Sequence, residues 1–416
     1  MLHGHCAACK ILGVLAGLLL LAQANTTQIK SLDDYLKLDT GKPSWSVGPK
    51  SRELSELRLN GLTWQGDLWR HEIVIAGSKL NSDLAILNLT GDRMENSMDD
   101  FTILFSKTCK LPVVTVYGIP NQPSFGMRED ELVSYGIRQF FMTKDDTWPL
   151  LMPMTKSAKH AMDAVQEWSK GRLKRFIVTG TSKRGATSWL VASTGDPRVV
   201  GIVPTVADLM MDMTGQLKYQ KAAWGQYTPV IPEFKTMDPV PFFSMPRGKQ
   251  MMALVDPYFA LPRVKVPALV VAGGSDQLTV LDGAKLYWDE IKSPKLFKLI
   301  PNASHFFAIP NALHGGYSQA QSIDMMMSVR FFADCITGID KRGLPKIEDQ
   351  SDPRRSSERT WSVVGDSAWL NESIWKPAVA SPNDRFSASI QEVTYRGNGY
   401  SASFSSLVSM KMAKSK

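Results

Sequence analysis

One stretch, residues 175–185, constrains the fold more than any other part of this chain. It reads RFIVTGTSKRG: an apolar, β-prone run, a serine flanked by glycines, and then the start of a helix-like segment. A strand that turns sharply into a helix presents the serine hydroxyl and the first helical N–H groups to the same point in space. The stretch therefore predicts a nucleophilic serine, Ser182. A serine that merely precedes an ordinary helix can occur in a similar sequence.

Candidate partners for the serine follow it in the order acid, then histidine. An apolar run over 267–274 leads to Asp276, and a second run over 295–300 leads to His305. In an α/β-hydrolase the triad has this chain order, and each member follows the carboxyl end of a strand. The sequence thus predicts a triad of Ser182, His305 and Asp276.

Other acids and bases leave alternatives open. Asp208 also follows a strand-like run, so it is a second candidate for the acid, and His314 is a second candidate for the base. His71 and His160 fall on elements that should be remote from the serine. No histidines have the spacing of a helical metal site, and no glycine-rich phosphate loop follows the first strand, so neither a metal nor a cofactor is expected.

Strand-like and helix-like runs alternate along most of the chain. The expected strands are 57–64, 69–76, 84–92, 112–117, 175–179, 199–206, 267–272 and 295–300, and the expected helices are 98–108, 157–168, 281–291 and 320–336. Such alternation predicts an α/β fold in which helices cover both faces of a mostly parallel sheet. Sites in such sheets lie at the carboxyl ends of the strands.

Two segments interrupt this alternation. Residues 208–265 are rich in methionine, proline and aromatic residues, which indicates either a cap over the pocket or a helical insertion that only stabilises the domain. Beyond residue 344, charged and serine-rich sequence precedes short alternating runs, which predict a small β-rich region over 345–416. A hydrolase-like domain is therefore expected over 25–340.

The N-terminus has the pattern of a secretory signal peptide. Its apolar core, 11–21, is too short to span a bilayer comfortably and precedes a small-x-small site, so we expect cleavage after Ala24 and a secreted protein without a membrane span. Glycosylation sequons at Asn25 and Asn371 suit a glycan. Those at Asn88, in a strand, and Asn302, near His305, do not.

Charge and cysteine content add two further expectations. The net charge of +8 is spread along the chain rather than concentrated, so no nucleic-acid partner is expected. Cys109 and Cys335 should lie on helices that cover the same face of the sheet. In an oxidising compartment they can form a disulfide, or they can remain two buried free thiols.

Several motifs resemble those of the PhoPQ-activated pathogenicity-related family. They are LDDY at 32–35, TW at 63–64 with WRH at 69–71, PNQP at 120–123, WP at 148–149 with MPMTK at 152–156, the serine turn, and DPY at 256–258. The resemblance covers about 30–340 and implies an α/β-hydrolase fold with a β-sandwich-like tail. It also implies a place among secreted, proliferation-repressor-like proteins. Trp64 and Trp69 are expected in the core.

The loops around the serine have expected roles of their own. The backbone N–H of Lys183 should hold an oxyanion together with an N–H from Gly91 or Asp92, a position where the family tends to show paired glycines. Arg184 should pair with a carboxylate and hold the turn, or else meet an anionic group of the substrate.

Asn121 and Gln122 are expected either at the pocket rim or in a purely structural turn, because their proline-flanked loop leaves a strand near the active one.

Two functions fit these observations. The first is a secreted serine hydrolase, an esterase or peptidase that acts on a small-molecule or peptide acyl substrate through an acyl-enzyme. The second is a secreted signalling protein that binds a cell-surface receptor through the same scaffold and needs no catalysis.

Overall fold

The computed structural model describes residues 27–49, 51, 53–93, 95–209, 211, 214–231, 234, 238–307, 318–365, 370, 373–379 and 386–411. The expected signal peptide, 1–24, lies outside the described residues, as do Asn25, His314 and Asn371. Within the described part of the chain, no helix combines the length and apolar character needed to cross a bilayer.

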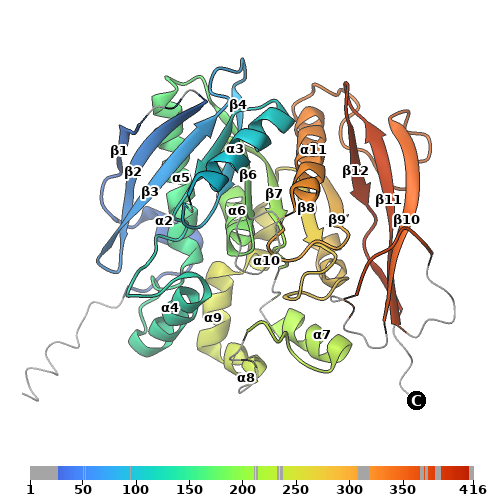
Figure 1. Cartoon of the computed structure of the whole chain (residues 1–416). Helices are drawn as coiled ribbons and strands as arrows, with labels where there is room; N and C mark the ends of the chain where they lie inside the picture. Colours follow the sequence, from blue (N-terminus) through green and yellow to red (C-terminus); the bar gives the residue numbers. More distant parts are fainter. Residues whose placement is uncertain are drawn as a thin grey trace, which may run out of the picture.

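A mixed sheet of nine strands, counted over the described residues, forms the centre of the molecule (Figure 1). Its spatial order is β1 (Ser44–Val47), β2 (Leu54–Trp64), β3 (Asp67–Ala76), β5 (Val113–Val116), β4 (Leu84–Leu89), β6 (Arg175–Thr181), β7 (Val199–Thr205), β8 (Ala268–Gly273) and β9 (Lys295–Ile300). The strands from β5 to β9 in this order run parallel, whereas β1, β2 and β3 pair antiparallel. The predicted α/β architecture is confirmed, and the fold is that of an α/β-hydrolase.

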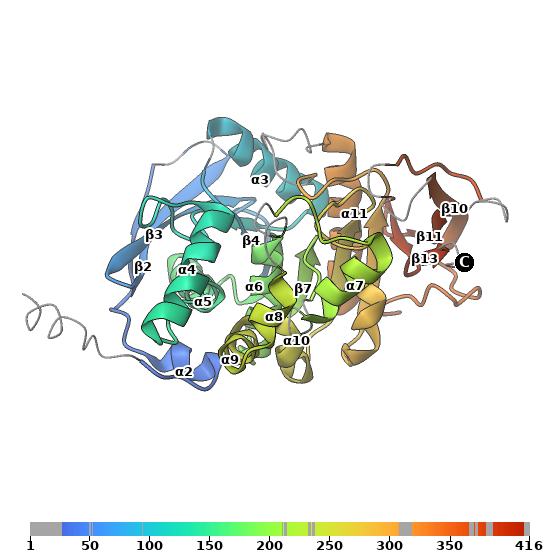
Figure 2. The same ribbon diagram turned by 90° about the horizontal axis from the view of Figure 1, so that it is seen from below.

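Helices cover both faces of this sheet, as Figure 2 shows. On one face α3 (Glu95–Cys109) packs beside α11 (Gln319–Ile336), and on the other lie α5 (Leu151–Trp168) and α6 (Lys183–Ser193). Each face has its own apolar cluster. This double covering explains why the parallel strands read as continuous apolar runs: β5, for example, is buried at every position.

The antiparallel end of the sheet buries the two tryptophans assigned to the core. Trp64 ends β2 and Trp69 lies in β3, and their rings pack edge to face with centroids 5.8 Å apart. Before this hairpin, the short helix α2 (Leu32–Lys37) is capped by the Ser31 hydroxyl and buries Tyr35.

The insertion after β7 is helical. Its helices α7 (Thr214–Trp224), α8 (Pro239–Ser244) and α9 (Pro246–Val255) lie, with α4 (Glu129–Thr143), at the edge where the parallel strands end (Figures 1 and 2). α10 (Pro257–Ala260) and a 3-10 turn at Leu261–Arg263 lead the chain back to β8. Proline begins α8, α9 and α10, where its missing N–H costs no hydrogen bond. The helix α4 was not expected.

One expected helix, 281–291, is absent from the structure. The segment forms only two 3-10 turns, η3 (Gly283–Leu286) and η4 (Trp288–Glu290). Between them Tyr287 has φ −126°, which breaks helical geometry, and its buried hydroxyl donates to Asp208. The tertiary contact of Tyr287 overrides the amphipathic spacing that suggested a helix.

The expected β-rich region at the C-terminus is confirmed. Strands β10 (Arg355–Gly365), β11 (Phe386–Arg396), β12 (Ser401–Ser405) and β13 (Ser409–Lys411) form an antiparallel sheet. It packs against the hydrolase domain where β12 meets β9 and α11. There the fully buried Lys298 of β9 contacts Glu392 of β11 at 3.2 Å and Asp324 of α11 at 2.8 Å.

The two cysteines do not form the disulfide that the sequence allowed. Both are free and buried, although α3 and α11 do share a face of the sheet. The thiol of Cys109 donates to the Met326 carbonyl at 3.2 Å, whereas Cys335 lies in the last turn of α11. A helix rises about 1.5 Å per residue, so Cys335 lies roughly 13 Å further along α11 than Met326. Disulfides need Cα atoms within about 7 Å.

Candidate active site

Ser182 occupies the turn between β6 and α6 with a backbone that non-glycine residues rarely adopt. Its φ is 61° and its ψ is −128°. The Ser182 N–H donates to the Thr205 carbonyl of the neighbouring strand end at 2.9 Å, which fixes the turn. A Cβ on Gly185 would lie 2.6 Å from the Cβ of Ala207, so only glycine lets the helix approach so closely. This is the strained strand-turn-helix geometry of a nucleophile elbow.

His305 and Asp276 form a buried hydrogen-bonded pair. The His305 Nδ1 lies 2.8 Å from Asp276 Oδ2, and the residues are 7% and 2% exposed. The other carboxylate oxygen accepts from the Leu278 N–H at 2.8 Å. A carboxylate can only accept, so Nδ1 carries the proton and Nε2 is left as an acceptor. That is the tautomer a general base requires.

The loops that carry this pair are bonded to each other. The Ser275 N–H donates to the Ala303 carbonyl at 2.8 Å, and the Gly274 N–H donates to Ile300 at 2.9 Å. A Cβ on Gly273 would lie 2.5 Å from the Ala303 oxygen, so glycine is required at the end of β8. Backbone hydrogen bonds and close packing therefore join the acid loop to the histidine loop.

Ser182, Asp276 and His305 follow the carboxyl ends of β6, β8 and β9. They lie at the same edge of the sheet, because β6, β7, β8 and β9 are successive parallel neighbours. Among the described residues, no hydrogen bond joins the Ser182 hydroxyl to His305. In proteins without bound substrate such hydrogen bonds are often long and shorten only in the complex.

Asp208, the alternative acid, has a different partner. Its Oδ1 accepts from the Tyr287 hydroxyl at 2.5 Å, and it shares with Asp276 the lining of a small cavity of about 20 Å³. Burial, with a further contribution from the negative charge of Asp276, raises the pKa of Asp208 to about 7, against the hydrogen bond from Tyr287. Because His305 bonds to Asp276, the geometry favours Asp276 as the orienting acid.

Arg184 pairs with a carboxylate, which was one of the two roles predicted for it, the other being contact with an anionic group of the substrate. Arg184 is 6% exposed. Both terminal nitrogens of its guanidinium donate hydrogen bonds to Glu129 at 2.7 Å, and its Nε donates to the Ile119 carbonyl. Lys183 adds its ammonium to Glu129 at 2.8 Å. Burial of Glu129 would raise its pKa, but the charges of Arg184 and then Lys183 outweigh burial and lower it. Glu129 therefore remains ionised and holds the helix side of the turn.

The residues expected to bind an oxyanion lie around this ion pair. As the first residue of α6, Lys183 has no acceptor within the helix for its N–H. Gly91 lies against the Arg184 guanidinium: a Cβ on Gly91 would be 2.8 Å from Arg184 Nη2 and 2.9 Å from Glu129. Asp92 forms an ion pair with Arg128, although burial raises the pKa of the Asp92 carboxyl.

Asn121 and Gln122, expected at the rim or in a structural turn, both use their amides within the protein. Gln122 accepts from the Glu129 N–H at 2.8 Å and donates to its carboxylate at 2.7 Å. Asn121 accepts from the Arg70 N–H at 3.0 Å. These contacts place Gln122 in the same network as Arg184.

Glu129 is the residue that sequence reasoning missed. Two adjacent cations, Lys183 and Arg184, directly after the serine require an anionic partner, and the acidic run 129–131 was the available signal.

The two histidines expected to be remote from the serine lie on other elements. His71 lies in β3 and bonds to Tyr117 O and Ser157 Oγ, and burial lowers its pKa to about 4. His160 lies in α5, where burial again lowers its pKa. Within the described parts of the chain, no three histidine, cysteine or acidic side chains converge as metal ligands.

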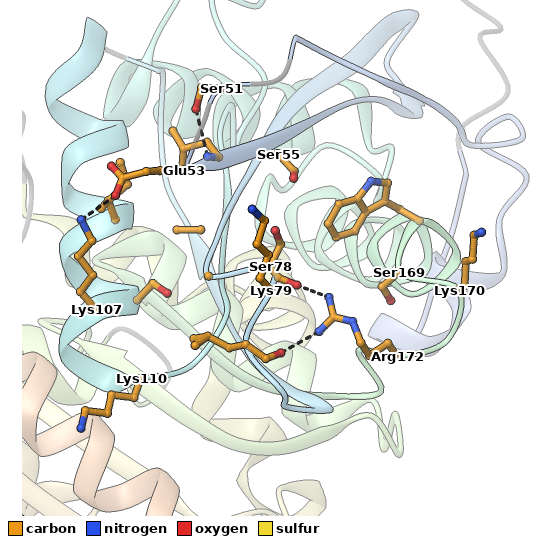
Figure 3. A pocket seen from close by; sticks show the side chains of 17 residues that line it. Ser51, Glu53, Ser55, Ser78, Lys79, Lys107, Lys110, Ser169, Lys170 and Arg172 are labelled. Carbon is orange, nitrogen blue, oxygen red and sulfur yellow. Dashed lines mark hydrogen bonds and ion pairs between the residues drawn. The ribbon is translucent and has the colours of Figure 1, made fainter.

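A larger cavity, of about 920 Å³, opens at the opposite edge of the sheet (Figure 3). Its lining includes five cationic side chains, Lys79, Lys107, Lys110, Lys170 and Arg172. Lys107 pairs with Glu53 at 2.8 Å, and Arg172 donates to backbone carbonyls of the loop that contains Lys79.

A sequence model described as PhoPQ-activated pathogenicity-related protein matches residues 32–364, most of the chain. The chain belongs to this family. The family match begins at α2, contains Ser182, Asp276 and His305, and ends within β10. The rest of the C-terminal sheet lies beyond it.

Autocrine proliferation repressor protein A of Dictyostelium discoideum is 28% identical over 315 residues. The match covers 69% of this chain and 63% of the relative, less than two thirds of the relative's length.

Among solved structures, acetyl xylan esterase 1 of a Thermoanaerobacterium species has a TM-score of 0.49 at 17% identity, covering 74% of this chain and 98% of its own. The acetyl xylan esterase of a Paenibacillus species has a TM-score of 0.48 at 12% identity, covering 69% of this chain and 94% of its own.

Proposed function

We propose that this protein is a secreted serine hydrolase of the esterase or peptidase type. The observation that carries the proposal is the buried His305–Asp276 hydrogen bond of 2.8 Å, at the same sheet edge as a serine held in the strained turn before α6. Structural ion pairs are common, but this combination supplies a nucleophile, a base in the required tautomer and a buried orienting acid.

The proposed reaction is acyl transfer through a covalent intermediate. The Ser182 oxygen attacks the carbonyl carbon of an ester or peptide while its proton passes to His305 Nε2, and Asp276 stabilises the resulting imidazolium. The oxyanion is held by the Lys183 N–H and by an N–H from Gly91 or Asp92. His305 then gives the proton to the leaving group. Water, deprotonated by His305, attacks the acyl-enzyme; the ester bond to Ser182 breaks, His305 returns the proton to the Ser182 oxygen, and the acid is released.

A fluorophosphonate probe, which phosphonylates activated serines, tests this proposal directly. The folded protein should be labelled, and Ser182→Ala should abolish labelling with little change in melting temperature. Ser188→Ala is the matched control, because Ser188 lies in the same helix and donates only to the Gly185 carbonyl. Labelling that persists in Ser182→Ala, or a folded wild-type protein that is never labelled, would reject the nucleophile.

Secretion is tested on the same protein expressed in a eukaryotic host. The secreted chain should begin at Asn25, and glycans should be found at Asn25 and Asn371 but not at Asn302, whose amide bonds to the Trp375 backbone. Intact mass and peptide mapping after enzymatic deglycosylation give both answers. Retention of residues 1–24 on the mature chain would contradict this proposal.

A second candidate function, binding to a cell-surface receptor without catalysis, is favoured by the lysine-lined cavity. Lys79, Lys110 and Lys170 have no ion-pair partner among the described residues, so an anionic group could bind there. Retention on immobilised heparin should fall with Lys110→Glu and not with the control Lys42→Glu, whose exposed side chain lies near the opposite end of β2. Equal retention of both variants would remove this candidate.

A further inference from the structure

Trp375, from the segment between β10 and β11, connects the C-terminal region to the two loops of the candidate triad. Its side chain is 1% exposed, and the indole N–H donates to the Gly274 carbonyl at 2.7 Å. Its backbone N–H donates to Asn302 Oδ1 at 2.7 Å, and its carbonyl accepts from Asn302 Nδ2 at 3.1 Å. One residue thus binds both loops.

The contacts fall close to the reacting groups along the chain. Gly274 precedes Asp276 by two residues, and Asn302 precedes His305 by three. Asn302 has φ 59°, a conformation that asparagine tolerates better than most residues, so its amide is aimed at Trp375 by the turn itself. A Cβ on Gly274 would lie 2.8 Å from the indole nitrogen, which shows how closely the acid loop approaches Trp375.

The acid loop has a second support a few residues further along the chain. From the insertion, Gln220 donates to the Leu278 carbonyl at 2.8 Å and Thr228 donates to the Gln277 carbonyl at 2.7 Å. The C-terminal region therefore holds the acid loop before Asp276, and the insertion holds it after Asp276.

We propose that Trp375 is a positioning residue for the His305–Asp276 pair, so that the C-terminal region is part of the hydrolase machinery and not a separate module. This inference rests on the proposed hydrolase function. The physical reason is that a hydrogen bond between two side chains on different loops keeps its length only if the loops are fixed. Trp375 joins both loops through three hydrogen bonds, of which the indole bond to Gly274 is buried, where a hydrogen bond is strong, and the two with Asn302 are part-buried.

Trp375→Phe is the principal test, because it keeps a buried aromatic ring and removes the indole N–H together with part of the ring volume. Trp361→Phe is the matched control: Trp361 lies in β10, and its indole N–H bonds to Glu392 rather than to either loop. A second variant, Asn302→Gly, removes both bonds to the Trp375 backbone while permitting the positive φ. Melting curves confirm that each variant is folded.

Two readouts are measured on each folded variant. The first is the fluorophosphonate labelling rate as a function of pH. In Trp375→Phe and Asn302→Gly it should fall about 10- to 100-fold, the cost of a displacement of the order of 1 Å. The midpoint of the profile should also move to lower pH, since a displaced Asp276 stabilises the imidazolium less. Trp361→Phe should match the wild type in both respects.

The second readout is the downfield proton resonance of the hydrogen-bonded His305 Nδ1–H, which needs no activity. It should broaden or move upfield in Trp375→Phe and Asn302→Gly. If the wild-type protein is not labelled, the hydrolase proposal fails while this resonance still decides whether Trp375 positions the pair. The inference would be overturned if both variants had the same resonance and the same pH profile as the wild-type protein.

Discussion

Glu129→Gln isolates the contribution of the ion pair that holds the turn after Ser182. The substitution keeps the size of the side chain and removes its charge. In the wild-type protein the carboxylate accepts two hydrogen bonds of 2.7 Å from the Arg184 guanidinium and one of 2.8 Å from Lys183. A glutamine amide can accept at one oxygen only, and its NH₂ would face the guanidinium donors.

The expected loss of stability follows from the burial of Arg184. Removing one partner of a buried ion pair costs about 3–5 kcal/mol, because the remaining charge is left without compensation. The Glu129 side chain is 42% exposed, so water can replace part of the lost interaction. We therefore expect a loss of roughly 2–3 kcal/mol, which for a chain of this length corresponds to a fall in melting temperature of only about 2–4 °C.

Urea unfolding of Glu129→Gln and of Glu131→Gln is the appropriate assay. Glu131 lies in the same first turn of α4, but its side chain is exposed, so the control carries the same chemical change without the ion pair. The stability gap between wild type and Glu129→Gln should also depend on pH. Because the pKa of Glu129 is lowered in the folded protein, the gap is complete above the ordinary value of 4.5 and shrinks below it.

The result that would refute this reasoning is a loss in Glu129→Gln within about 0.5 kcal/mol of the Glu131→Gln control, the usual range for a surface substitution. A gap that grew as the pH fell below 4.5 would equally contradict the assigned direction of the pKa shift.

Three further outcomes are expected. Alkylation in denaturant without reductant should modify both Cys109 and Cys335, which the mass of the protein reports. If the two cysteines are alkylated only after reduction, they are not free thiols. The ring signals of His71 should not titrate between about pH 8 and pH 5, because burial lowers its pKa to about 4. The unfolded chain takes up this proton near the ordinary value of 6.5, so stability is lost as the pH falls from about 6.5 to about 4. Gly91→Ala should slow fluorophosphonate labelling, since its Cβ would displace the Arg184 guanidinium, and an unchanged rate would place this loop away from the oxyanion.

Local sequence pattern was sufficient to predict most of the sheet. Runs such as Val113–Val116 are β-branched and buried on both faces, so the strand preference and the tertiary environment agree. The turn at Ser182 was predictable for the same reason: the glycine at 185 is needed by the packing of α6 against the end of β7, and the packing is specified by adjacent residues.

Prediction failed where a distant side chain decides the local conformation. The spacing over 281–291 favours a helix, but the buried Tyr287 bonds to Asp208 and divides the segment into two 3-10 turns. The disulfide alternative failed because the sequence gives the face of the sheet on which α3 and α11 lie, but not their relative height. Height along a helix pair depends on side-chain packing, and no periodicity encodes it.

The same limit applies to the parts of the site that come from far along the chain. Glu129 lies 55 residues before Arg184, and Trp375 lies 101 residues after Gly274. Glu129 holds the turn at Ser182, whose φ of 61° is strained. Trp375 holds the loop at Gly274, where there is no room for a side chain. A strained turn persists only when its surroundings over-determine it. Glu129 and Trp375 therefore each supply, from a distant segment, a restraint that the local sequence of the loop lacks. Substituting either residue should displace Ser182 or His305 before it disturbs the sheet.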